Sequence, residues 1–119
     1  MTRALFAALL ILSLALVRPA TEAGAHAAFI TATPAPDSTV DSAPWEVRII
    51  FSQTVMRAST ISVTGPDGTP ISGDTVVEDN VAHADIFPWG PGVYTVQWSN
   101  VSAEDGHASS GQFTFTSLS

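Results

Sequence analysis

The stretch VYTVQWSN at residues 93–100 is the clearest β-strand signal in the chain. Its apolar side chains at Tyr94, Val96 and Trp98 alternate with other residues, and successive side chains of a strand point to opposite faces of a sheet. The three therefore share one face, which we expect to be buried. Prolines and glycines at 88–92 break the chain just before this run, as at the entry of a strand.

Similar alternating runs recur between turn signals, and no helical periodicity follows residue 25. The other expected strands cover residues 29–33, 46–52, 60–64, 70–78, 81–87 and 112–117. Seven or eight short strands in one small domain indicate an immunoglobulin-like sandwich. We therefore predict an all-β fold, an immunoglobulin-like Greek-key β-sandwich of antiparallel strands. Gly92-Val93-Tyr94 also fits a tyrosine corner, in which the phenol hydroxyl bonds to the preceding crossover.

A leader precedes this domain. Residues 5–17 are an apolar run, broken only by Ser13, behind Arg3. The run is shorter than the about 20 residues of a membrane span and is typical of a signal-peptide core. Small residues at Ala23 and Ala25 then satisfy the cleavage rule of signal peptidase. We expect residues 1–25 to be removed and the protein to be periplasmic or secreted.

The mature chain would then be one domain of 94 residues, 26–119, and would begin with His26. Two alternatives remain open. Cleavage after Ala27 would satisfy the same small-residue rule and discard His26. Retention of the leader would instead anchor the domain to a membrane.

The expected mature chain is acidic and contains neither lysine nor cysteine. Arg48 and Arg57 are its only formal cations, against ten acidic residues, so its formal charge is −8. Nucleic acid is excluded as a partner because phosphate binding needs a basic surface. The acidity favours a cationic ligand or a basic protein face, or it serves only solubility. The absence of cysteine excludes thiolate metal sites.

An amino-terminal histidine is a chelating group, because its α-amine and ring Nδ1 together close a six-membered ring around a metal. In the predicted sandwich the first strand starts at the end where the penultimate strand finishes. His26 should therefore lie beside the loop at 101–111, which contains Asp105 and His107. The combined donor set is three nitrogens and one carboxylate oxygen.

This donor set suits Cu(II), which favours tetragonal ligation by nitrogen and oxygen. Zinc remains a competitor because tetrahedral His/His/Asp sites also exist. Calcium and magnesium are disfavoured because they need oxygen ligands. Each half also has a simpler reading: Asp105-Gly106-His107 as an ordinary turn, and His26 as a solvated terminal residue.

From residue 26 on, the chain resembles the CopC family of periplasmic copper-resistance proteins over nearly its full length. The matching pieces are residues 26–29, 50–52, 91–98, 101–102, 105–107 and 111–115. The resemblance implies an exported β-sandwich that binds Cu(II) through His26 and the loop residues Asp105 and His107. It also implies a CopD-type membrane partner for copper transport.

The sequence departs from the family pattern in three places. Gln53 stands where members commonly carry a glutamate, which removes a possible auxiliary carboxylate. The segment 103–104 is one residue longer than the usual approach to the loop. Met56 is the only methionine after the leader, and one thioether cannot form the methionine-rich Cu(I) site of some members. We therefore expect one Cu(II) per mature chain.

We expect a non-enzymatic, monomeric copper binder that acts as buffer or carrier in copper resistance and homeostasis, because catalytic metal sites usually keep an open position. Two alternatives are a copper monooxygenase of the histidine-brace type and a metal-free immunoglobulin-like adhesion or assembly module. His83 and Asp85 stand two positions apart on one expected strand and could therefore share a face. We interpret these two as an exposed pair on an edge strand.

The donor set predicts that Cu(II) affinity falls steeply between about pH 7 and pH 5, because the metal must displace protons from an amine and two imidazoles. Competition titrations of the exported protein against a chelator across this range measure the effect. A flat affinity would contradict a donor set built from these nitrogens.

Overall fold

The computed structural model describes residues 26–119, and the predicted signal peptide at 1–25 lies outside the described residues. Within the described part, no helix is long and apolar enough to cross a membrane. The strands are β1 (Phe29–Thr33), β2 (Thr39–Val40), β3 (Glu46–Phe51), β4 (Thr60–Thr64), β5 (Ser72–Glu78), β6 (Val81–Ile86), β7 (Gly92–Val101) and β8 (Ala108–Ser117).

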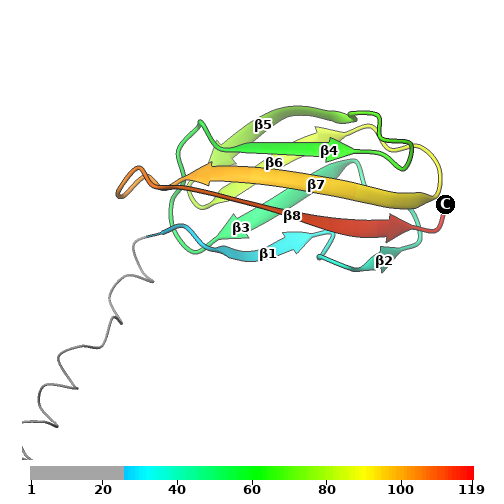
Figure 1. Ribbon diagram of the computed structural model, residues 1–119, viewed down its shortest axis with the longest axis horizontal. Helices are drawn as coiled ribbons and strands as arrows, with labels where there is room; N and C mark the ends of the chain where they lie inside the picture. Colours follow the sequence, from blue (N-terminus) through cyan, green and yellow to red (C-terminus); the bar gives the residue numbers. More distant parts are fainter. Residues whose placement is uncertain (1–25) are drawn as a thin grey trace, which may run out of the picture.

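The strands form two four-stranded sheets packed face to face (Figure 1). One sheet has the order β1-β3-β6-β5 and the other β2-β8-β7-β4. This is the immunoglobulin arrangement of an ABED sheet against a GFC sheet, with β2 added beside the last strand. The predicted all-β sandwich is confirmed. One strand pair departs from the antiparallel expectation: β2 pairs with β8 in parallel, because the chain keeps its direction after β1 and crosses to the other sheet.

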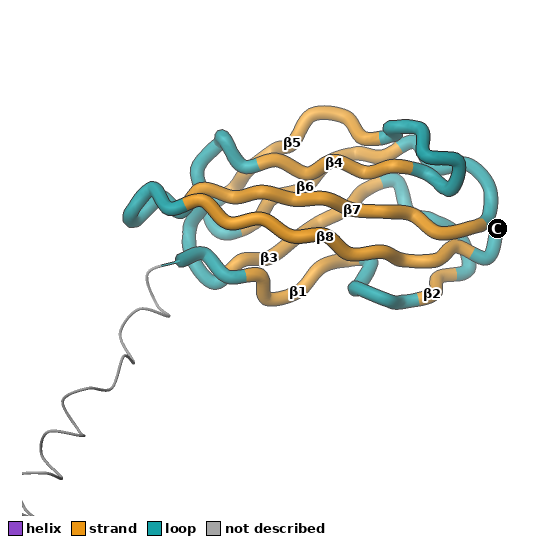
Figure 2. The backbone as a smooth tube through the Cα atoms, viewed as in Figure 1, coloured by secondary structure: helices purple, strands orange, loops and turns teal. Residues whose placement is uncertain are grey.

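Alternating side chains from both sheets fill the space between the layers. Val47, Ile49 and Phe51 of β3 are at most 1% exposed, as their spacing predicts. In the other sheet, Tyr94 of β7 and Phe115 of β8 are cross-strand neighbours. Their rings face the core and stack with centroids 5.1 Å apart. The long, continuous β7–β8 hairpin that carries this pair runs the length of the molecule (Figure 2).

Trp98 is partly buried near one end of the sandwich. Its size explains the glycine on the neighbouring strand. Its ring packs 5.4 Å from Phe51 and 5.9 Å from Phe29, measured between centroids. Gly111 is its cross-strand partner, and a Cβ there would lie 2.5 Å from the indole. The glycine therefore makes room for the indole to lie flat across β8.

The tyrosine corner is present. The Tyr94 hydroxyl donates a 2.7 Å hydrogen bond to the carbonyl of Gly90, in the crossover before β7. Tyr94 itself is fully buried, so the phenol links the core to the loop at the end of the sandwich opposite His26.

Substitution Tyr94→Phe should therefore lower the free energy of unfolding by about 1–2 kcal/mol, because it removes one hydrogen bond and leaves the ring packing intact. Urea denaturation measures this change. The dependence on denaturant should stay the same, since the exposed surface does not change. A variant as stable as the parent would show that the hydroxyl bond contributes nothing.

Candidate metal centre

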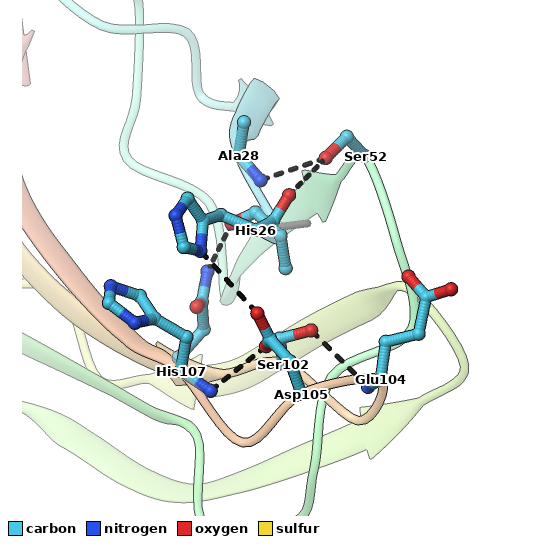
Figure 3. A network of polar contacts seen from close by, with 9 residues as sticks. His26, Ala28, Ser52, Ser102, Glu104, Asp105 and His107 are labelled. Atoms are coloured by element: carbon cyan, nitrogen blue, oxygen red, sulfur yellow. Dashed lines mark hydrogen bonds and ion pairs between the residues drawn. The ribbon is translucent and has the colours of Figure 1, made fainter. Parts of the chain in front are cut away.

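The residues expected to bind metal lie at one end of the sandwich, where β1 begins and the β7–β8 hairpin turns. His26 stands three positions before β1, and Asp105 and His107 belong to the loop between Val101 and Ala108, which pair across the hairpin. Figure 3 shows the three side chains gathered at this end. Segments almost 80 positions apart thus meet because of strand order.

The side chains of His26, Asp105 and His107 are close but not in direct coordination geometry. The imidazoles of His26 and His107 have centroids 4.0 Å apart and planes tilted by 39°. The Nδ1 of His26 lies 3.8 Å from Oδ2 of Asp105. That nitrogen is shielded from solvent and makes no hydrogen bond. A shielded nitrogen facing a carboxylate is a suitable position for a cation, because a cation would satisfy both groups.

The loop is held by its own hydrogen bonds. The backbone N–H of His107 donates to Oδ1 of Asp105 at 3.0 Å, and the N–H of Gly106 donates to the carbonyl of Ser102 at 2.9 Å. Gly106 has a φ of +70°, a conformation that glycine adopts without strain. One oxygen of Asp105 therefore shapes the turn, and the other faces His26. The turn reading and the ligand reading of this tripeptide are compatible.

The local hydrogen bonds also fix the charge of the carboxylate. The backbone N–H of His107 holds the pKa of Asp105 below its ordinary value of 3.8, helped by the Ser102 hydroxyl and by the two nearby imidazoles. The carboxyl remains ionised through mildly acidic conditions. It can therefore act as an anionic ligand wherever the imidazoles have lost their protons.

The described residues contain no three His, Cys, Asp or Glu side chains already placed around one ion. The two imidazoles lie against each other, so both must turn to direct a nitrogen at a shared point. The fourth expected donor, the α-amine, exists only after cleavage before His26. The fold therefore places the donor residues close together, but their side chains must still rotate into the coordination geometry when a metal binds.

Gln53, the residue that departs from the family pattern, lies beside this centre. With Thr54, Ala103 and Glu104 it lines an open hollow of about 520 Å³. Met56 is half exposed, and its backbone bonds to Val101 on β7.

The interpretation of His83 and Asp85 as an edge-strand pair is wrong. β6 lies between β3 and β5, and His83 is largely covered. Its Nδ1 is 3.3 Å from Glu46, and its Nε2 is 3.7 Å from Glu78. The two carboxylates occupy opposite nitrogens of one ring, so they cannot both join that ring in binding a single ion.

Two polar residues near the centre were not assigned a role from the sequence. Ser52 contacts His26 and Ala28, and Asn100 contacts Ala27. Ser52 belongs to the matching piece 50–52, which was the only available signal. Asn100 ends the expected strand at 93–100, and nothing in the sequence distinguishes it from an ordinary polar residue of a strand.

The strand order and the two-layer core define an immunoglobulin-like β-sandwich. A family model described as "CopC domain" matches residues 29–117, and the chain therefore belongs to the CopC family. The matched range includes Asp105 and His107 and begins after His26. The crystal structure of CopC from Methylosinus trichosporium OB3b is similar, with a TM-score of 0.71 and 25% identity, over 77% of this chain and 93% of that one. No curated protein matches the chain.

In the copper-free protein, the Asp105 carboxyl should titrate below its ordinary value of 3.8, which carboxyl-carbon NMR measures directly. Because its folded-state pKa is lowered, its contribution to stability is present above the unfolded value and is lost as the pH falls through the folded value. A midpoint at or above the ordinary value would show that the His107 N–H does not bind this carboxylate in solution.

Proposed function

We propose that the protein is exported and that its mature form binds one Cu(II) through His26, Asp105 and His107. The observation that supports this most strongly is the shielded Nδ1 of His26, which makes no hydrogen bond and faces the Asp105–His107 loop. Membership of the CopC family supports the same reading. The proposal includes cleavage before His26 and a periplasmic or secreted location.

The donor chemistry follows from the residues. Cleavage before His26 frees an α-amine, which with Nδ1 of the same residue forms the chelate. An imidazole nitrogen of His107 and Oδ2 of Asp105 complete three nitrogens and one oxygen. Cu(II) accepts this tetragonal set and heads the divalent affinity order, so it should displace zinc from the same ligands.

Copper is the cargo of this site rather than a catalytic centre. The four donors of the proposed set would all come from the chain's own residues, whereas catalytic metals usually keep one position open. We therefore propose a monomeric, non-enzymatic buffer or carrier in copper resistance and homeostasis. A CopD-type membrane protein is the proposed recipient of the metal.

Ligand substitutions test this assignment. His26→Ala and His107→Ala should each weaken Cu(II) binding by more than about 100-fold, beyond the usual effect of residues that only support a ligand. His83→Gln is the matched control, since His83 is the remaining histidine of the mature chain and lies between Glu46 and Glu78. Isothermal titration of the exported protein with a competing chelator gives both affinity and stoichiometry. Normal affinity in the two ligand variants, or a second tight copper, would contradict the proposal.

The role of the free terminus has its own test. A mature chain whose amino terminus is acetylated keeps every side chain but converts the α-amine of His26 into an amide. Its Cu(II) affinity should fall as much as that of His26→Ala. Equal Cu(II) affinity of the acetylated and the unmodified chain would show that the α-amine is not a ligand, whatever the imidazole does.

A further inference from the structure

The amino-terminal segment is fastened to the sandwich at three consecutive carbonyls. The Ser52 hydroxyl donates to the carbonyl of His26 at 3.2 Å, and the Ser52 N–H donates to that of Ala28 at 2.8 Å. Between them, the Asn100 side-chain amide donates to the carbonyl of Ala27 at 2.8 Å. The Ser52 oxygen also accepts the N–H of Ala28 at 2.8 Å (Figure 3).

These bonds fix a part of the chain that is usually mobile. The first residues of a domain are poorly ordered unless they are tied down. Here Ala27 is 1% exposed and belongs to the core. Ser52 follows directly on β3 and Asn100 belongs to β7, so one contact comes from each sheet. His26 is therefore held at the junction of the two layers, next to the loop that carries its partner residues.

Asn100 is an unusual choice for this core position. It is fully buried, and its Oδ1 has no hydrogen-bond partner. A buried acceptor without a partner is unfavourable, and an apolar side chain would avoid that cost. The benefit of an amide at this position is its bond to Ala27, 73 positions away in the chain.

We infer that Ser52 and Asn100 are positioning residues for copper binding: they hold the amino-terminal histidine in place before the metal arrives. This inference rests on the proposed function. A terminus ordered in the folded protein does not have to be ordered on binding, so the chelate loses less conformational entropy when it closes. The hydrogen bonds of both side chains go to the amino-terminal segment.

A double-mutant cycle with His26 tests the inference. In the mature protein, Ser52→Ala should weaken Cu(II) binding about 10-fold, the effect expected when a ligand loses its support. In a His26→Ala background whose amino terminus is acetylated, the same change should alter the residual affinity less than about 2-fold, because residue 26 then offers neither imidazole nor amine to position. Asn100→Ala should show the same coupling, and Ser52→Thr, which keeps the hydroxyl, should restore affinity.

Tyr94→Phe is the control for a general loss of stability. Tyr94 is buried, and its hydroxyl donates a hydrogen bond to the carbonyl of Gly90, in the crossover before β7 and away from the loop that carries Asp105 and His107. This variant should have a lower melting temperature but unchanged Cu(II) affinity. Equal effects of Ser52→Ala with and without His26, or no effect on affinity at all, would overturn the inference. A normal affinity of His26→Ala alone would instead refute the proposed ligand set.

Discussion

The hydrogen bonds between the amino-terminal segment and the ends of β3 and β7 are the constraint on which the candidate centre depends. Ser52 and Asn100 satisfy three successive carbonyls at 26–28 and bury Ala27. Without them His26 would precede an edge strand on a free end of the chain. With them, His26 is fixed beside the loop that carries Asp105 and His107.

The second half of the centre is organised independently of the first. Asp105 accepts the N–H of His107, Ser102 exchanges backbone bonds with the loop, and Gly106 provides the positive φ that the turn requires. The sandwich topology brings the two halves together, because β1 starts where β7 ends. The contacts of His26 with Asp105 and His107 and the bond from Asn100 to Ala27 then join them directly.

The sequence predicts those parts of the fold that depend on local alternation of apolar residues. The buried faces of β3, β4 and β7 follow from a period of two. The register shift of β5 between Ser72 and Thr75 does not follow from such a pattern. β2 has two residues and no alternation, so it carries no such signal. The first residues of β8, 108–111, are small and show no alternation of apolar side chains, so the sequence indicates this strand only from residue 112.

The meeting of His26 with the loop could be predicted because it follows from strand order, whereas finer relations could not. The error at His83 arose because alternation gives the face of a residue but not the neighbours of its strand. The contact between Asn100 and Ala27 joins residues far apart in the chain through a single amide. Nothing in the composition near either residue indicates it.

Pulsed electron paramagnetic resonance of the copper-loaded, exported protein, with its histidines labelled with ¹⁵N, tests the central claim most directly. If His26 and His107 are the ligands, the spectrum will show two inequivalent imidazole nitrogens coupled to one Cu(II), together with a directly bound nitrogen from the amino terminus. A spectrum with one imidazole or none, or with no amine nitrogen, would contradict it, because the ion would then be bound elsewhere or by a different set of ligands.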